Sequence, residues 1–401
     1  MTRGATNSRP LRITAYTLSS AAGDGRARTL ESLRERRSGL RRNDFGAAPL
    51  ATWIGRVPGL EDEPLPAELA DWDCRNNRLA WRGLTADAFV DAARAAGLRY
   101  GSDRVAVIVG TSTSSIGASE DAYRRLEPDG SYPPDLRRPI IHTPHSLGDF
   151  VQHALGLTGI SVTVATACSS SAKVFAQAQR LLRAGLADAA IVGGVDTLCD
   201  SVLFGFNSLE LVSSELCRPF DVARRGINLG EAAGFALLER DAKRGPWLLG
   251  YGESSDAHHM SSPHPEGLGA RAALRDALAS AQLRADEIDY INLHGTATPR
   301  NDEVEARVVA DMFPADTVAS STKGWTGHTL GAAGIIEAAI SLMALEHDLL
   351  PGTLNSQTLD PMCGPQIRCD NVERRAAHAL SFSFGFGGSN CVLVFGRGDL
   401  S

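Results

Sequence analysis

Short runs of residues that are hydrophobic at every position, rather than at every second one, constrain the fold of this chain more than any other feature. They are rich in Val and Ile and are bounded by turn residues, as in strands whose sheet is covered on both faces. The runs span residues 104–110, 161–165, 189–195, 290–293 and 390–395. Helices must cover such a sheet on both sides, so the sequence predicts an α/β fold.

Segments with helical spacing lie between these runs, at residues 85–96, 172–184, 270–281, 303–312 and 332–345. A chain of 401 residues exceeds the size of most single cores. One strand-like run leads through Cys168 into an Ala-rich helix, and the later string STKGWTGHTLGAAG leads into another. We therefore expect two halves, an N-terminal one at residues 1–245 and a C-terminal one at residues 246–401.

Charge and cysteine usage exclude several classes of protein. The formal net charge is −7, which gives no support to a nucleic-acid-binding face. No apolar run reaches the length that spans a bilayer, and the N-terminal stretch lacks the apolar core of a signal peptide. The seven cysteines include no CxxC pair, which argues against a disulfide framework or a zinc site. We expect a cytoplasmic protein that binds neither nucleic acid nor membrane.

Cys168 is the first candidate for chemistry. It lies in the string VTVATACSSSAKVFAQAQRLL, where a strand ends and a helix begins within about three residues. At a helix N-terminus the macrodipole and the free N–H groups favour a thiolate. The small residues around the sulfur leave room for a substrate. The sequence indicates a nucleophile here, and a buried structural cysteine is the alternative.

Two histidines stand at positions typical of an active site. His294 follows the strand-like string YINL where a Gly/Thr turn begins, and such loop edges often carry function. His328 lies between a Gly-rich turn and a helix, with Lys323 before it and Glu337 after it. The alternatives are a hydrogen-bonded core residue for His294 and a helix cap or packed residue for His328.

A Gly-rich string, SFSFGFGGSN at residues 381–390, connects two strand-like runs. Its glycines allow the backbone to approach a ligand and to present N–H groups. It lacks the spacing and the lysine of a nucleotide-binding P-loop, so ATP is not expected. A tight connection between packed strands is the alternative.

Together these four strings resemble the β-ketoacyl-(acyl-carrier-protein) synthase family of the thiolase-like fold, in its elongating branch. TACSSS matches the nucleophile motif, HGTATPRND the first histidine motif, STKGWTGHTLGAAG the lysine and second histidine motif, and SFGFGGSN the closing glycine loop. RPFDVARRGINLGEAAGFALLE and DAHHMSSPHPEG match further signatures, and the latter accounts for His258, His259 and His264 without a metal. The resemblance covers residues 100–396 and implies two similar α/β halves, each thiolase-like, in a layered αβαβα arrangement.

The match departs from the family at three places. LRITAYTLSS replaces the Gly-rich opening strand, Ala232 stands where Gly is normal, and Arg225 stands where an acidic residue is common. These departures concern the subgroup and the substrate rather than the catalytic set. They favour a specialised pathway, such as polyketide or aryl-polyene synthesis, over housekeeping fatty-acid synthesis.

The resemblance implies a decarboxylative condensation of an acyl chain on Cys168 with malonyl-acyl-carrier-protein, in fatty-acid or polyketide chain elongation. His294 and His328 would stabilise the enolate, and the backbone N–H groups of Cys168 and Phe386 would hold the oxyanion. The other implied roles are ordering of the site by Lys323 and its partner Glu337, gating of the acyl pocket by Phe386, and binding of the phosphopantetheine arm by Thr296 and Thr298.

The implied partners are acyl carrier protein, whose phosphopantetheine arm carries the substrate, and a second ketosynthase-like chain. The family forms dimers across the edge of its central sheets, with an identical chain or a paralogue. No metal and no tightly bound cofactor is implied. The alternatives are a chain-length partner of a heterodimeric synthase, a thiolase-type acyltransferase and a pure carrier-binding module. Intact Cys168, His294 and His328 argue against the first, and His328 argues against the second.

An acidic carrier protein needs a basic dock on this acidic chain. The string CRNNRLAWR lies in a region that is near the carrier entrance in relatives. We expect the dock at its three arginines, Arg75, Arg78 and Arg82.

Overall fold

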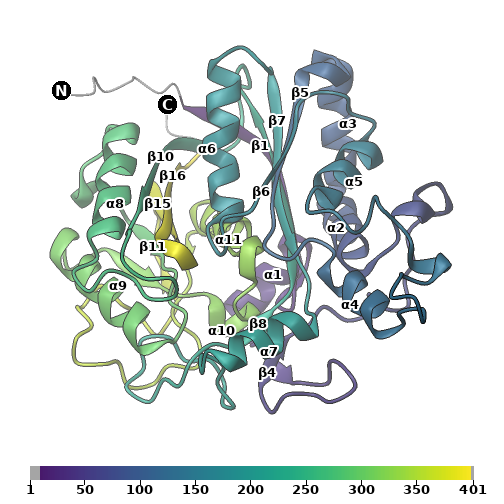
Figure 1. Cartoon of the computed structure of the whole chain (residues 1–401). Coiled ribbons are helices and arrows are strands. Elements are labelled where there is room, and N and C mark those ends of the chain that lie inside the picture. The colour runs from purple at the N-terminus through teal and green to yellow at the C-terminus, as the bar shows by residue number, and fades with distance from the viewer. Residues whose placement is uncertain (1–9, 399–401) are drawn as a thin grey trace.

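A computed structural model describes residues 10–398, and it confirms the α/β class (Figure 1). The first residues of the N-terminal stretch, 1–9, and the last residues of the expected C-terminal half, 399–401, lie outside the described residues.

Strands from the first part of the chain lie side by side in the order β6-β5-β7-β9-β1. β5 is parallel to β6 and to β7, whereas β9 is antiparallel to β7 and to β1. Their bounds are Leu11–Ser20 for β1, Val105–Gly110 for β5, Ser161–Val164 for β6, Ala189–Asp196 for β7 and Ala232–Glu239 for β9.

Strands from the second part repeat this arrangement in the order β12-β11-β15-β16-β10. β11 is parallel to β12 and to β15, whereas β16 is antiparallel to β15 and to β10. Their bounds are Trp247–Ser255 for β10, Tyr290–Asn292 for β11, Val318–Ser320 for β12, His378–Gly385 for β15 and Ser389–Gly396 for β16.

The two sets therefore share one topology. In each, the strands lie in the order third, second, fourth, fifth, first, with the same relative directions. A short antiparallel pairing of β1 with β10, at Leu11↔Leu248 and Arg12↔Trp247, joins them edge to edge. From this correspondence we infer two similar halves that divide between β9 and β10, near residue 245.

Helices form layers outside and between the two sets of strands (Figure 1). In β5, Val105, Val107 and Val109 pack against an outer layer, whereas Ala106 and Ile108 face the central layer. Burial on both faces explains why the strand is hydrophobic at every position. The central layer is α6 (Ser170–Arg183) and α11 (Ala333–His347); the outer layers are α2 (Arg75–Thr85), α3 (Phe89–Tyr100) and α5 (Ser146–Leu155) on one side, and α8 (Leu268–Ala281) and α9 (Pro299–Met312) on the other.

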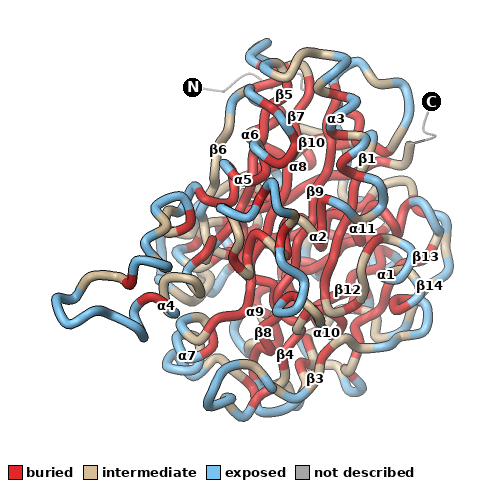
Figure 2. Tube along the Cα trace, turned by 90° about the vertical axis from the view of Figure 1, so that its right-hand side faces the viewer, coloured by how far each residue is buried: buried red, intermediate tan, exposed pale blue. Residues whose placement is uncertain are grey.

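The remaining elements are short and lie around this core, which Figure 2 shows as buried chain within an exposed surface. One loop next to α4 projects from the body. These elements are α1 (Gly25–Arg34), α4 (Ile116–Arg124), α7 (Asp200–Ser208), α10 (Lys323–Thr326), β2 (Gly23–Asp24), β3 (Arg41–Arg42), β4 (Trp53–Gly55), β8 (Leu229–Gly230), β13 (Leu349–Leu350) and β14 (Val372–Glu373).

Two expectations from the sequence need correction. The helix expected at residues 85–96 is divided, because Asp87 and Ala88 adopt left-handed φ values of 54° and 56° between α2 and α3. The stretch Leu330–His347 is long and apolar enough to cross a bilayer, contrary to the expectation that no run is. It is 89% buried between the two sets of strands, so its apolar surface belongs to the core.

Candidate active site

Cys168 occupies the corner between β6 and α6. The chain turns sharply there, with Ala167 in a left-handed conformation (φ 52°). The hydroxyl of Ser170, the first residue of α6, accepts the N–H of Thr166 at 2.8 Å and donates to the carbonyl of Ala167 at 2.6 Å. The corner holds the sulfur at the N-terminus of α6, as the sequence predicts, with only 4% of Cys168 exposed.

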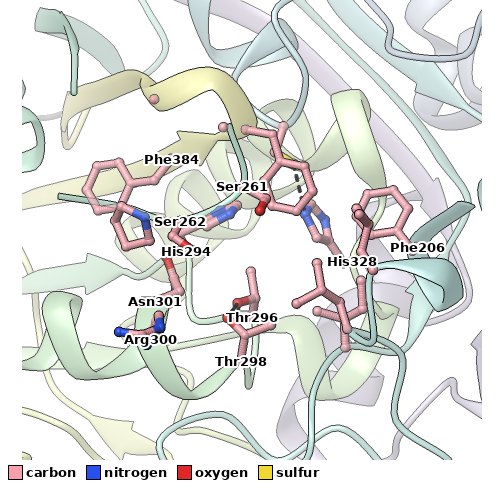
Figure 3. Close-up of a pocket in the computed structure, with 18 of the residues that line it drawn as sticks. Phe206, Ser261, Ser262, His294, Thr296, Thr298, Arg300, Asn301, His328 and Phe384 are labelled. Atoms are coloured by element: carbon pink, nitrogen blue, oxygen red, sulfur yellow. Dashed lines mark hydrogen bonds between the residues drawn. The ribbon is translucent and has the colours of Figure 1, made fainter. Parts of the chain in front are cut away.

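The structure brings Cys168, His294 and His328 together, although 126 residues separate the first from the second. His328 Nε2 lies 3.0 Å from Cys168 Sγ, and the two imidazole rings are 5.3 Å apart and almost perpendicular. The sulfur and one ring nitrogen from each histidine all lie within 4.8 Å of one another. Figure 3 shows both rings at the same cavity, with a dashed hydrogen bond at His328. His258, His259 and His264 are not part of this group.

Main-chain contacts fix each histidine. His294 follows β11, and its N–H and that of Gly295 donate to the two carboxylate oxygens of Glu305 on α9, at 2.6 and 2.7 Å. The N–H of His328 donates to the carbonyl of Asn228 at 2.7 Å. The N–H of Leu330 donates to His328 Nδ1 at 3.2 Å, so the proton of a neutral ring is on Nε2, facing the sulfur.

Lys323 and Glu337 form a buried ion pair behind the histidines. Lys323 Nζ donates to Glu337 Oε1 and to the carbonyl of His294, and it lies 3.4 Å from His294 Nδ1. An ammonium group donates but cannot accept, so Nδ1 of His294 accepts and its proton is also on Nε2. Glu337 comes from α11 and Lys323 from α10, so this pair lies entirely in the second half of the chain.

Burial sets the protonation states of the site. It lowers the pKa of His294 and of His328 well below the ordinary value, and the charge of Lys323 lowers both further. Both rings are therefore neutral N–H donors at neutral pH. Burial also raises the pKa of Cys168 to about 11, although Lys323 and the N–H of Phe386 act in the opposite direction. The resting sulfur is a thiol, which corrects the thiolate expected from the helix N-terminus alone.

A cavity of about 380 Å³ opens onto the side chains of Cys168, His294 and His328. Thr296 and Thr298 line it, with their hydroxyl oxygens 2.9 Å apart (Figure 3). Another part of the lining is aromatic, because Phe386 stacks on Phe206 with ring centroids 5.5 Å apart. The cavity lining therefore includes both polar and aromatic side chains.

The Gly-rich string is a shorter connection than expected, because residues 381–385 lie in β15 and residues 389–390 in β16. Residues 386–388 form the turn, which lies beside Cys168. Phe386 points its backbone N–H at the sulfur. A Cβ on Gly385 would lie 2.9 Å from the carbonyl oxygen of Thr166, so only glycine permits this approach. Gly387 and Gly388 have φ values of 76° and 74°, which favour glycine. The loop is thus both a tight connection and a wall of the site.

Asp196, at the end of β7, is a site residue that the sequence analysis missed. Its buried carboxylate accepts the N–H groups of Ser112 at 3.0 Å, Thr113 at 2.9 Å and Gly331 at 2.6 Å. Gly331 is three residues after His328, so this carboxylate ties the His328 loop to the first half of the chain. A single Asp after a buried strand gave no sign of this role.

The basic dock expected on α2 stays a prediction. Each of its arginines forms an ion pair with a carboxylate of this chain, and each side chain is 19–23% exposed. The pairs are Arg75 with Glu231 at 2.6 Å, Arg78 with Asp73 at 2.6 Å, and Arg82 with Asp24 at 2.7 Å. These carboxylates offset part of the charge that the dock would present to an acidic partner, while the three arginines stay partly exposed.

Comparison with known proteins gives a consistent result. Residues 81–244 match the family model "Beta-ketoacyl synthase, N-terminal domain", and residues 247–357 match "Beta-ketoacyl synthase, C-terminal domain". The chain is 38% identical to the mitochondrial 3-oxoacyl-[acyl-carrier-protein] synthase of Arabidopsis thaliana over 60% of this chain and 57% of that protein. It is 35% identical to Nodulation protein E of Rhizobium meliloti (strain 1021), over 73% of this chain and 75% of that one.

A solved structure extends the likeness to the whole fold. One chain of the complex of the ketosynthase ApeO with its chain length factor ApeC, from Xenorhabdus doucetiae, superposes with a TM-score of 0.87. The sequence identity is 36%, and the match covers 97% of this chain and 98% of that one. The two halves and their layers are therefore those of a thiolase-like ketosynthase fold.

Proposed function

The chain belongs to the β-ketoacyl synthase family, and we propose that it extends an acyl chain held on Cys168 with a malonyl unit from acyl carrier protein. One observation carries the proposal: a buried sulfur and the protonated Nε2 atoms of two neutral imidazoles face one cavity. The reaction belongs to fatty-acid or polyketide chain elongation.

The first step transfers the acyl chain. Cys168 attacks the thioester of acyl carrier protein, a new thioester forms on its sulfur, and the carrier sulfur leaves with the proton that Cys168 loses. The tetrahedral intermediate carries an oxyanion, which the backbone N–H groups of Cys168 and Phe386 stabilise. The position of the Phe386 N–H beside the sulfur supports this role.

The second step forms the carbon–carbon bond. Malonyl-carrier loses carbon dioxide, and the electron pair of that bond becomes an enolate whose charge lies on the thioester oxygen. The Nε2–H groups of His294 and His328 donate hydrogen bonds to this oxygen. The lowered pKa of each ring keeps it neutral, and each ring keeps its proton. The enolate carbon attacks the Cys168 thioester, the carbon–sulfur bond breaks, and the sulfur leaves as a thiolate that takes up a proton from solvent.

Other residues of the site bind and position. Thr296 and Thr298 bind the phosphopantetheine arm through their hydroxyl groups, which line the cavity. Lys323 is a positioning residue, because it bonds the carbonyl of His294 and lies against its Nδ1, and Glu337 balances its charge. Phe386 gates the apolar side of the cavity by stacking on Phe206. These steps use no metal and no tightly bound cofactor.

The assembly we propose is a dimer with a second ketosynthase-like chain. The relative from Xenorhabdus doucetiae was solved as a ketosynthase with its chain length factor, which supports a paralogue as one such partner. Cys168, His294 and His328 are all present, which supports the active role in such a pair. The seven cysteines are free thiols, which supports a reducing compartment such as the cytoplasm.

The test is to incubate the protein with acyl carrier protein bearing a labelled acyl chain and to measure the mass of the Cys168 peptide. We expect an acyl adduct on wild type and none on Cys168→Ala. With malonyl-carrier added, wild type releases carbon dioxide and β-ketoacyl product. His294→Ala keeps the adduct but loses this release, because the enolate loses a donor. A folded wild-type protein without an adduct refutes the proposal.

A further inference from the structure

The loop after β11 leads from the reacting atoms to solvent along one side of the cavity. His294 is 2% exposed and Thr296 is 6% exposed, Thr298 is half-buried, and Arg300 is exposed. All four line the same cavity, and Figure 3 shows Arg300 beside Thr298 and away from His328. An arm that reaches the sulfur past the two threonines therefore leaves the protein beside Arg300.

Arg225 lies against the same loop. The N–H of Gly226 donates to the carbonyl of Ala297 at 3.0 Å, between the two threonines. Ile227, two residues after Arg225, lines the cavity. Arg225 itself is exposed.

Both guanidinium groups are free to bind an anion. Within residues 10–398, neither Arg225 nor Arg300 forms an ion pair or a side-chain hydrogen bond, whereas the adjacent Arg224 pairs with Asp360 at 2.8 Å. Two carboxylates lie near this mouth. Asp256 lines the cavity and accepts hydrogen bonds from the N–H of His264 and the side-chain amide of Asn390, and the exposed Glu210 is adjacent to the lining residue Leu211. Arg225 and Arg300 nevertheless offer two guanidinium groups without a carboxylate partner among the described residues, on a chain with a net charge of −7.

We propose that Arg225 and Arg300 bind the phosphate of the phosphopantetheine arm and so place the carrier at this mouth. This inference rests on the proposed function. The thioester lies at one end of the arm and its only charged group, the phosphate, at the other. With the thioester at Cys168 and the amides beside the two threonines, the phosphate falls at the exposed end of the loop. Arginine binds phosphate through paired N–H donors, which makes it suited to this role.

The experiment compares three donors that carry the same acyl group: acyl-carrier protein, acyl-phosphopantetheine and acyl-pantetheine, which lacks phosphate. The readout is the rate of Cys168 acylation by mass spectrometry at subsaturating donor. For the double variant Arg225→Gln/Arg300→Gln we expect a loss of about tenfold or more with the first two donors, since hydrogen bonds to charged groups are the strong ones. Acyl-pantetheine should react at the wild-type rate, which also reports that the site is intact.

Arg183→Gln is the matched control. Arg183 is also exposed, but it is the last residue of α6, about 20 Å along the helix from the end that carries Cys168. It should leave all three rates unchanged. Added salt should slow wild type with the phosphate-bearing donors and have less effect on the double variant.

Each other outcome has a defined meaning. An unchanged rate with acyl-phosphopantetheine overturns the assignment, and a loss confined to acyl-carrier protein assigns the arginines to the carrier's own acidic surface instead. An equal loss with all three donors shows a damaged site and overturns it too. A wild-type protein that forms no adduct with any donor refutes the proposed function rather than this inference.

Discussion

At the scale of single residues, burial outweighs the helix N-terminus in setting the state of Cys168. The favourable effect of a helix terminus on a charge is about 0.3–1 kcal/mol. The pKa of the thiol rises from 9.0 to about 11, which corresponds to about 3 kcal/mol in favour of the neutral form. Hydrogen-bond donors around the sulfur therefore reduce the cost of the thiolate during attack without producing it at rest.

The pH dependence of Cys168 alkylation follows from this state. Because only the thiolate reacts, the rate with iodoacetamide should rise about tenfold for each pH unit from 7 to 10. The folded pKa of about 11 lies above this range, so no plateau should appear. A model thiol peptide in the same buffers approaches its plateau near pH 9 and serves as the control. Peptide-resolved mass spectrometry measures the rate, and a plateau for Cys168 below pH 9 would contradict the burial argument.

Sequence motifs predicted which residues meet at the cavity, because each string fixes a local turn that is largely independent of the rest of the chain. The strand-to-helix corner at Cys168 is such a turn, and its neighbours in sequence are its neighbours in space. The state of the arginines on α2 is different. The carboxylate partner of Arg75 is Glu231, and that of Arg82 is Asp24, both far away in the sequence. Only the tertiary fold decides whether such a charge has a partner within the chain, so the sequence could not predict these ion pairs, and the dock stays a prediction.

At the scale of elements, the crossing of α6 and α11 sets the distance between the sulfur and His328. α6 begins two residues after Cys168, and α11 begins five residues after His328. The helices meet closely, because a Cβ placed on Gly334 would lie 2.5 Å from the backbone nitrogen of Ala172. The small residues that make both helices Ala-rich are therefore a packing requirement of the central layer.

Gly334→Ala should consequently destabilise the protein and slow acylation. The added methyl group cannot fit without moving one helix, and overpacking of this kind typically costs about 1–3 kcal/mol. The matched control is Gly205→Ala in α7, where an added Cβ meets no atom within 4 Å, and which should stabilise by about 0.5–1 kcal/mol. Denaturant midpoints and the Cys168 acylation rate measure both effects. Equal midpoints for the two variants would disprove the close crossing.

Two of the strands that the sequence analysis missed, β9 and β10, lack a continuous run of large apolar residues. β10 is buried at every second position over much of its length, so it has no continuous apolar run. β9 reads AAGFALLE, in which small residues conceal full burial. A search for continuous runs rich in Val and Ile identifies central parallel strands such as β5 and β7. It overlooks the antiparallel strands β9 and β10, whose environment depends on partners distant in sequence.

At the scale of the whole molecule, the two similar halves explain how distant residues meet. In each half the third strand leads into a helix of the central layer: β6 into α6, and β12 into α10 and α11. The first connection carries Cys168, and the second carries Lys323 and His328. Because the two central helices pack together, these equivalent connections face each other. The proposed nucleophile Cys168 thus comes from one half, and Lys323 and His328 come from the other.

The two outer edges of the combined sheet differ in a way that indicates the dimer interface. The β12 edge is covered by the chain itself, since the N–H groups of Ala319 and Arg368 donate to the carbonyls of Gln366 and Ala319. Within residues 10–398, no strand pairs with the outer side of β6. An open edge with free N–H and C=O groups is a template for pairing with another chain. We therefore expect β6 to pair with a second ketosynthase-like chain.

Ser161→Pro tests the outer edge of β6 and leaves the hydrogen bonds between β6 and β5 in place. The carbonyls of Ile160 and Val164 bond β5, so by alternation the N–H of Ser161 points outward, and proline removes it. We expect wild type to sediment as a dimer and Ser161→Pro to shift toward monomer at the same concentration. Ser161→Ala removes the hydroxyl but keeps the N–H, so it should remain a dimer. A Ser161→Pro protein that dimerises as tightly as wild type would place the interface elsewhere, and a monomeric wild type would contradict self-association through this edge.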